Sequence, residues 1–224
     1  MTMAAVIFGI TLSMLHQSGL GALFLMAKEK IHPLWYSEFI PVMFLVSSIF
    51  AGLSMVIFEG SISHNVFFNQ ISEKNQLAQN GIILGLSKIC AGTMFAYFFL
   101  QLLVFVHKQR WDLLDTAMGH WFLLEMIGFV LFPMILFYTS YRSNNILMIK
   151  IAAIITMLGV ILNRLNVSII GFRWDMAVRY VPSWMEVIVA LSVIFTQIWI
   201  FRWVINRMPV LRDSPSWAVE LKNN

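Results

Sequence analysis

The sequence has 224 residues and a formal net charge of +4, with 59% hydrophobic and only 12% charged residues. A soluble domain usually carries about 25% charged residues, and a soluble chain of this length could not hide so much apolar surface from water. Lipid tails accept apolar side chains, so the composition predicts an integral membrane protein surrounded by lipid. Lys and Arg stand mostly at the ends of apolar runs, where they meet lipid headgroups. This placement argues against a nucleic-acid partner.

Six stretches are long and apolar enough to cross a membrane, since a spanning helix needs about 20 mainly apolar residues. In chain order they are about Ala4–Met26, Phe39–Phe58, Ile82–Val106, Trp121–Tyr138, Ile146–Ile170 and Met185–Val204. The first follows no basic n-region, so it indicates a membrane span and not a cleavable signal peptide. Short polar loops are expected at Lys28–Ser37, Ser63–Asn80, His107–Gly119, Ser140–Asn145 and Phe172–Ser183. The predicted fold class is an all-α, polytopic transmembrane helix bundle.

Six spans place both chain termini on the same side of the membrane. With this topology eight Lys and Arg residues fall on that side and six on the other, with the intramembrane Arg164 left out. The positive-inside rule then favours cytoplasmic termini, by a small margin.

The first span carries a histidine, His16, near its middle, followed by Gln17 and by the small residues Gly19 and Gly21. Ionisable residues inside a membrane are costly and usually face a protein interior or a water-filled cavity. Two interpretations stay open: His16 hydrogen-bonds a neighbouring helix, or it acts as a ligand or proton-relay group. The small residues leave room for another helix or a flat ligand.

A carboxylate and a guanidinium fall at similar depth in neighbouring spans. Glu125 lies about one turn inside the fourth span, and Arg164 lies late in the fifth, with Asn163 and Asn166 beside it. An Arg–carboxylate pair would relieve two desolvation penalties together. We expect the two side chains to contact each other or to share a water. The pair then either fixes helix packing or belongs to a polar pathway for protons.

Other polar residues give weaker indications. Glu59 ends the second span and Glu186 opens the sixth, where each favours a structural role near the interface. A buried b-type haem needs two axial ligands at matching depth, and only His16 is deep, so no haem is expected in this chain. The single cysteine, Cys90, cannot hold an iron–sulfur cluster, which needs about four thiolates, and we expect it to be an inert buried side chain. Metal motifs, phosphate loops and nucleophile elbows are absent from the sequence.

Five runs of sequence resemble one family. They are His16-Gln17-Ser18-Gly19-Leu20-Gly21, His32-Pro33-Leu34-Trp35, Met55-Val56-Ile57-Phe58-Glu59-Gly60, Leu162-Asn163-Arg164-Leu165-Asn166 and Tyr180-Val181-Pro182-Ser183-Trp184-Met185-Glu186. Together they resemble the membrane subunit of hydrogenase-2-type periplasmic nickel–iron hydrogenases, in the NrfD/polysulfide-reductase C superfamily. The resemblance covers nearly the whole chain.

The resemblance implies a quinone-reactive membrane anchor without redox cofactors of its own. Such a subunit exchanges electrons with an iron–sulfur subunit on the periplasmic face, which serves a catalytic head such as a nickel–iron hydrogenase. The hydrogenase members have more spans, and this chain resembles only their C-terminal six. Another membrane chain is therefore expected to supply the missing N-terminal helices, whether the protein is naturally split or the chain is truncated.

The first span of this single transmembrane domain, residues 1–224, is then expected to complete a quinone-binding bundle with that other chain, and the remaining spans to form a second bundle. In polysulfide-reductase-like relatives a tyrosine near the place of His16 hydrogen-bonds the quinone, and an imidazole can also donate to a quinone carbonyl. The resemblance thus predicts a site for menaquinone or ubiquinone at His16, Gln17 and Gly19.

The sequence therefore predicts a multi-pass subunit of a respiratory oxidoreductase in a bacterial or archaeal cytoplasmic membrane. It would pass electrons between a periplasmic iron–sulfur subunit and the quinone pool. Protons would move through polar residues, for which the candidates are Glu125, Arg164, Asn163, Glu186 and Glu59. The alternatives are a transporter or channel component and a subunit that carries b-type haem. A transporter predicts a cavity at broken helices, and only Phe132-Pro133 interrupts a span.

Overall fold

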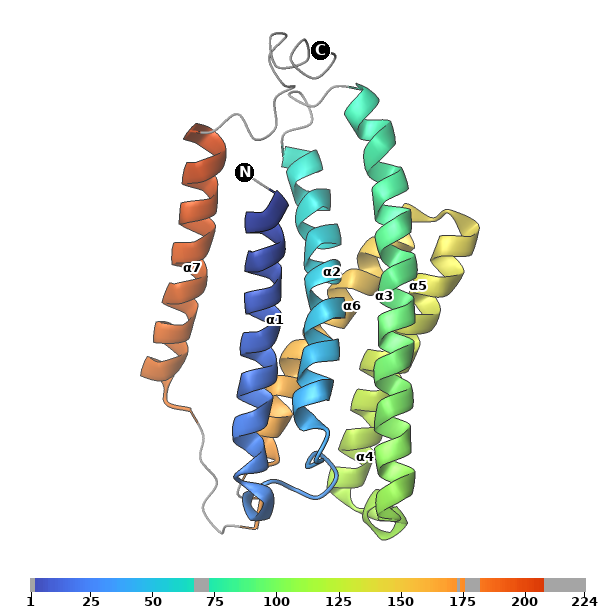
Figure 1. The fold of residues 1–224 in the computed structure, drawn as a ribbon, viewed down its shortest axis with the longest axis vertical. Helices are drawn as coiled ribbons and strands as arrows, with labels where there is room; N and C mark the ends of the chain where they lie inside the picture. Colours follow the sequence, from blue (N-terminus) through green and yellow to red (C-terminus); the bar gives the residue numbers. More distant parts are fainter. Residues whose placement is uncertain (1–2, 67–72, 173, 176–181, 208–224) are drawn as a thin grey trace. The chain divides into compact units, whose positions relative to one another are not determined.

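The computed structural model describes residues 3–66, 73–172, 174–175 and 182–207 (Figure 1). Among these residues the regular structure is helical, apart from one isolated β-bridge between Ile31 and Phe172. Six helical spans in the described ranges are long and apolar enough to cross a membrane. The prediction of a polytopic helix bundle is therefore confirmed, and the protein is a multi-pass membrane protein.

Each predicted span contains a helix. The elements are α1 (Met3–Leu25), η1 (Lys28–Lys30), α2 (Ile40–Val66), α3 (Glu73–Lys108), η3 (Trp111–Asp115), α4 (Ala117–Leu124), η4 (Glu125–Leu131), α5 (Phe132–Ser143), α6 (Ile146–Leu165), η5 (Asn166–Ile170) and α7 (Trp184–Arg207). Of the short elements, η1 and η3 are 3₁₀ helices, whereas η4 and η5 are π-helices. The fourth span is the continuous run of α4, η4 and α5, and the fifth is α6 with η5.

The predicted loop Ser63–Asn80 is wrong at both ends. Helix α2 continues to Val66, and α3 already begins at Glu73. The start of α3 is rich in Glu, Lys, Gln and Ala, which favour helix without any need for burial. Part of the predicted loop Phe172–Ser183 lies outside the described residues, as does the start of the sequence run at Tyr180.

The chain divides into two compact units. The first comprises residues 1–61 and 80–179, so it contains α1, α4 to α6 and most of α2 and α3. The second comprises residues 62–79 and 180–224 and contains α7, with Glu186 in its first turn. The buried polar residues described below lie in the first unit.

Local sequence explains how the fourth and fifth spans begin and end. Thr116, in an extended conformation, caps α4 by accepting a hydrogen bond from Gly119 N at 3.0 Å. In a regular α-helix Pro133, which has no N–H, would clash with the carbonyl one turn before it. The π-helical turns of η4, which are wider, lie directly before Pro133. Helix α5 ends at Asn144, whose φ of 52° is tolerated by asparagine, and Asn145 then caps α6.

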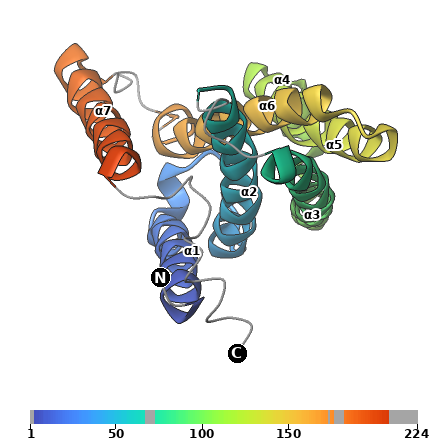
Figure 2. The ribbon, with the colours of Figure 1, turned by 90° about the horizontal axis from the view of Figure 1, so that it is seen from above.

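Close approaches between helices occur at two glycines. A Cβ at Gly159 of α6 would lie 2.7 Å from the Phe129 Cβ and 3.0 Å from the Phe129 carbonyl oxygen in η4. A Cβ at Gly21 of α1 would lie 2.9 Å from Pro41 Cα at the start of α2. The absence of a side chain at each glycine lets α6 approach η4 and lets α1 approach α2. Figures 1 and 2 show α6 crossing α2 and α3 on one side of this pair.

Between α2 and α3 the core contains small polar groups among apolar side chains. Cys90 is fully buried, as predicted, with its Sγ 3.4 Å from Ser54 Oγ. From α6, Thr156 Oγ1 contacts Met94 Sδ of α3 at 3.7 Å. The first contact joins α2 to α3, and the second joins α6 to α3.

Candidate functional site

A buried carboxylate lies at the centre of the first unit. Glu125 is the first residue of η4 and only 2% exposed. Its side chain accepts three hydrogen bonds: from Trp35 Nε1 at 2.8 Å, from Asn163 Nδ2 at 2.5 Å and from Asn166 Nδ2. All three partners donate, which suits a group that only accepts, because an ionised carboxylate has no proton to give.

Asn163 connects this carboxylate to Arg164. The Asn163 amide nitrogen donates to Glu125 Oε1, and its oxygen accepts from Arg164 Nη1 at 3.1 Å. Arg164 Nη2 also donates to Ser47 Oγ at 2.7 Å, and its guanidinium lies 3.6 Å from the centre of the Phe44 ring. Glu125 and Arg164 are thus joined through the Asn163 amide. A direct contact or shared water between them stays a prediction.

The orientation of Asn166 follows from a second tryptophan. Trp121 Nε1 donates to Asn166 Oδ1 at 3.0 Å, so the amide nitrogen of Asn166 is the end that faces Glu125. Asn166 is fully buried and is the first residue of η5. We call these residues the Glu125 network, which comprises Trp35, Ser47, Trp121, Glu125, Asn163, Arg164 and Asn166.

Two of the network residues begin π-helices. Glu125 opens η4 and Asn166 opens η5, and the two side chains bond each other across the helices. π-Helical turns are uncommon, are less favourable than α-helical turns and occur often at functional sites. Their coincidence with the two polar side chains indicates that the backbone departs from the α-helix where the network is built.

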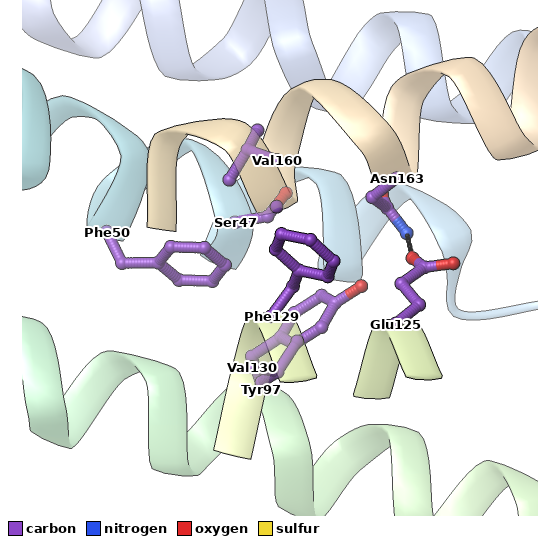
Figure 3. A pocket seen from close by; sticks show the side chains of 9 residues that line it. Ser47, Phe50, Tyr97, Glu125, Phe129, Val130, Val160 and Asn163 are labelled. Carbon is purple, nitrogen blue, oxygen red and sulfur yellow. Dashed lines mark hydrogen bonds between the residues drawn. The ribbon is translucent and has the colours of Figure 1, made fainter. Parts of the chain in front are cut away.

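A small cavity lies beside the network (Figure 3). It is lined by Ser47, Phe50, Tyr97, Glu125, Phe129, Val130, Gly159, Val160 and Asn163. Figure 3 shows the Tyr97 hydroxyl on the side of the cavity where Glu125 and Asn163 lie. The space open to the centre of a water molecule is about 10 Å³, close to the minimum that one water needs.

A larger groove lies on the other side of Arg164, between α1, α2 and α6. Its volume is about 670 Å³, and its polar lining residues are Ser13, Gln17, Ser48, Arg164 and Ser168. The other lining residues are apolar or glycine, among them Phe24, Phe44 and Met157. Arg164 therefore connects an open groove, which we call the α1 groove, with the buried carboxylate.

The loop between α1 and α2 brings Trp35 into the network. His32 N donates to Gly171 O at 2.8 Å next to the Ile31–Phe172 bridge, which ties this loop to the end of η5. The His32 ring is buried, its Nδ1 accepts from Leu34 N at 3.3 Å, and burial lowers the pKa of this imidazole. Trp35 follows in the same turn and is only 4% exposed.

Of the site residues predicted from sequence, the structure brings Glu125, Asn163 and Arg164 together. Gln17 lines the α1 groove and so shares a surface with Arg164, whereas His16 and Gly19 are exposed on other sides of α1.

The two other predicted carboxylates are not among the network's bonds. Glu59 is half-buried and lies twelve residues beyond Ser47 along α2, and Glu186 belongs to the second unit. Within the described ranges, no three His, Cys, Asp or Glu side chains gather as a metal site.

Sequence reasoning missed Trp35, Tyr97 and Trp121. Trp35 and Trp121 were interpretable only as interface aromatics or a span end, because their partners are distant in sequence. In the sequence, Asn166 is distinguished only as a neighbour of Arg164. Its position three residues after Asn163, which puts both amides on one face of a helix, was the signal that could have placed it at Glu125.

Residues 1–174 match the family described as polysulphide reductase, NrfD. The chain belongs to the NrfD family. The resemblance found in the sequence is thereby confirmed, and the match includes every residue of the Glu125 network. Helix α7, in the second unit, lies beyond the matched residues of this NrfD chain.

Two relatives match nearly the whole length of the chain. One, from Nitratidesulfovibrio vulgaris strain Hildenborough, is described only as a protein; it is 40% identical over 219 residues, which is 97% of this chain and 56% of the relative. The other is the "probable Ni/Fe-hydrogenase 2 b-type cytochrome subunit" of Escherichia coli K12, 26% identical over 207 residues, 91% of this chain and 51% of the relative. The NrfD chain thus spans about half the length of either relative. No solved structure matches it closely enough to show a relationship.

Proposed function

We propose that this chain is a quinone-reactive membrane subunit of a multi-subunit respiratory oxidoreductase, and that the α1 groove receives the quinone ring. The observation that carries the proposal is the position of Arg164, which lines the groove and is bonded through Asn163 to Glu125. Membership of the NrfD family and the hydrogenase-subunit name of one relative support the same function.

The α1 groove has the size and lining of a site for a flat lipophilic ring. Its volume of about 670 Å³ falls within the range of about 300–1,000 Å³ that is usual for small-molecule sites. The Gln17 amide can donate a hydrogen bond to one quinone carbonyl. The Arg164 guanidinium supplies a positive charge for the negative charge that builds on the quinone oxygens as electrons arrive.

Arg164 cannot supply the protons that turn quinone into quinol, because a guanidinium does not deprotonate in proteins. We propose that protons reach the groove through the Glu125 side of the network, where the small cavity has room for about one water. Tyr97 and Ser47 line that cavity and offer hydroxyl groups to such a water. In this proposal Glu125 and Asn163 hold the inner end of the path, and Glu59 and Glu186 are candidates for its further course.

A second membrane chain completes this proposal. His16 and Gly19 lie on exposed sides of α1, where a deep imidazole is costly unless another helix or the quinone contacts it. The chain spans about half the length of the relatives, so their further length leaves room for additional helices. The other partners would be a periplasmic iron–sulfur subunit and a catalytic head such as a nickel–iron hydrogenase, with menaquinone or ubiquinone as the substrate, in a bacterial or archaeal cytoplasmic membrane with cytoplasmic termini.

The test is turnover of quinone by the purified complex, with reduction of a soluble dye by the donor subunit as the internal control. Gln17→Leu should lower quinone turnover by about tenfold or more, the value of one lost hydrogen bond, while dye reduction is unchanged. His16 does not line the α1 groove, so His16→Ala should lower turnover to the same extent only if the quinone also contacts the face of α1 that carries His16. His16→Tyr should retain more activity than His16→Ala, because the phenol can also donate.

Thr11→Ala is the matched control on the same helix, since Thr11 is exposed and its hydroxyl donates to the Ile7 carbonyl oxygen. It should leave both activities unchanged. Wild-type quinone turnover in both His16→Ala and Gln17→Leu, with the complex assembled, would place the quinone site in another chain. An absorbance spectrum with haem bands that belong to this chain would favour the cytochrome alternative instead.

A further inference from the structure

A second groove of the first unit lies between the start of α2 and the end of α3 and has both charged and apolar walls. Its volume is about 610 Å³. Its lining residues are Ser37, Glu38, Phe39, Leu100, Leu103, Val104, His107 and Lys108. We call it the Lys108 groove. It shares no lining residue with the α1 groove, and none of its lining residues belongs to the Glu125 network.

The walls of this groove change from polar to apolar along α3. Lys108 ends α3, and Glu38 stands two residues before α2 begins at Ile40, so both charged groups lie where their spans reach the membrane surface. Leu100 lies eight residues, about 12 Å along the helix, before Lys108. Between them Leu103 is 49% exposed, as expected for a side chain that contacts lipid. A molecule that fills the groove therefore needs a charged end at the surface and an apolar end in the hydrocarbon core.

One cation and one anion stand at the surface end of the groove. Lys108 Nζ donates a hydrogen bond to the Tyr36 carbonyl oxygen and lies 5.0 Å from the centre of the Tyr36 ring. An ammonium has three N–H donors, so two remain for a ligand. Glu38 is exposed, and its carboxylate accepts no hydrogen bond within the part of the chain that the structure describes. The groove thus offers donors on a positive group and acceptors on a negative group at one end.

Phosphatidylethanolamine has the complementary arrangement of groups. Its phosphate can accept from Lys108, its primary ammonium can donate to Glu38, and its acyl chains supply the apolar end. Phosphatidylglycerol has the phosphate but no ammonium, and the quaternary ammonium of phosphatidylcholine has no N–H to donate. Lys28 and Arg110 add positive charge around Lys108 without lining the groove, so they attract the phosphate of any of these lipids. An extended peptide would bring unpaired backbone groups to the depth of Leu100, which the membrane core disfavours.

We propose that the Lys108 groove binds one phosphatidylethanolamine molecule, with its phosphate on Lys108 and its ammonium on Glu38. One acyl chain lies along the α3 wall toward Leu100. The headgroup then also supports the loop that carries Trp35. Lys108 is bonded to Tyr36, the residue after Trp35, and Trp35 donates to the buried Glu125. The inference concerns a structural lipid and does not depend on where the quinone binds.

The test uses phosphatidylethanolamine and phosphatidylglycerol probes with identical tails, each carrying a photoreactive diazirine on one acyl chain near the ester. The full chain, with the subunits that copurify, is placed in phosphatidylcholine nanodiscs that contain one probe, illuminated, and cleaved after Lys and Arg. Residues 89–108 carry the α3 wall of the groove. Residues 111–142 carry exposed apolar side chains of the fourth span, such as Ile127 and Ile135, and none of the groove's lining, so they report general contact with lipid.

The ratio of phosphatidylethanolamine label to phosphatidylglycerol label should be about fivefold higher in 89–108 than in 111–142, the effect of one hydrogen bond. Glu38→Gln should reduce this difference to about twofold, because a neutral amide is a weaker acceptor for an ammonium. Glu38→Lys should reverse the preference in favour of phosphatidylglycerol. Glu29→Gln is the matched control: Glu29 is also exposed in the loop between α1 and α2 but does not line the groove, so the difference should stay at its wild-type value.

Equal label ratios in the two peptides, or a wild-type difference in both Glu38 variants, would overturn the inference. So would labelling of 111–142 without labelling of 89–108 by either probe, the result expected if a helix of another chain covers the groove. Soluble phosphoethanolamine, which has the headgroup charges but no acyl chains, should not compete with the lipid probe at millimolar concentration. Competition by it would show a site for a small ion and would also overturn the inference.

Discussion

Replacing Glu125 by glutamine removes one charge and one acceptor from the centre of the network while keeping the shape of the side chain. An amide oxygen in the place of Oε2 can still accept from Trp35 and Asn166. The new NH₂ group then faces the Asn163 nitrogen, which is also a donor. Turning Asn163 over does not help, because its nitrogen would then face Arg164 Nη1, another donor. In every arrangement at least one buried donor opposes another.

The size of the effect follows from these contacts. One buried donor left without an acceptor costs about 1–3 kcal/mol. Removing one partner of a buried charge pair costs about 3–5 kcal/mol when the other charge has no remaining contacts. Arg164 keeps its hydrogen bond to Ser47 and its contact with Phe44, which lowers that cost. We therefore expect Glu125→Gln to lower the free energy of unfolding by about 3 kcal/mol.

Reversible unfolding in mixed micelles, with increasing denaturing detergent, measures this difference. Glu59→Gln is the matched control, because it also removes one carboxylate from the membrane region but none of the network's bonds, and it should change the free energy of unfolding by no more than about 0.5 kcal/mol. If Glu125→Gln is no less stable than Glu59→Gln, the hydrogen bonds to Glu125 do not hold the first unit together, and the account of the network is wrong.

Two further outcomes follow from the contacts of the network and of the loop above it. In a double-mutant cycle, Glu125→Gln and Arg164→Met should couple by about 1 kcal/mol or more in unfolding free energy. Repeating the cycle in an Asn163→Leu background should remove most of that coupling, because the Asn163 amide bridges the two side chains. Strictly additive effects of Glu125→Gln and Arg164→Met would contradict the bridge. Burial lowers the pKa of His32 below its ordinary value of 6.5. As the pH falls through that value, the unfolded chain therefore binds more protons than the folded chain. The free energy of unfolding should then decrease as the pH is lowered from about 7.5 to about 5.5. The pH slope of unfolding free energy should be smaller in His32→Gln, and an unchanged slope would exclude His32 as its source.

The spans were predictable because hydropathy reports directly on the cost of exposing polar groups to lipid. All six predicted stretches contain helices. The extra turns at the start of α3 were not predictable. They are polar and lie beyond the membrane core, where hydropathy no longer distinguishes helix from loop. The π-helical turns of η4 and η5 were not predictable either, since nothing in the residue types from Glu125 onward distinguishes them from an α-helix.

The candidate site was predictable in part. Topology and depth were enough to put Glu125 and Arg164 in one layer of the membrane. They could not show that Asn163 lies between the two, because that depends on the rotation of α6 about its axis, which Gly159 sets by packing on Phe129. The position of Trp35 could not be predicted for a different reason. Its place depends on a loop folded back onto the end of η5, a long-range contact without a periodic pattern.

The two π-helices also constrain how this protein can change. A π-helical turn is equivalent to one residue inserted into an α-helix, so deleting a single residue such as Ile127 would let the fourth span close as a regular helix. Side chains beyond the deletion would then keep about the same orientation relative to those before it, because the closed turn takes up the missing residue. The same holds for η5 after Asn166. Each of these spans could therefore lose one residue without turning its lipid-facing side chains inward, and the Glu125–Asn166 bond is the contact that such a deletion would endanger.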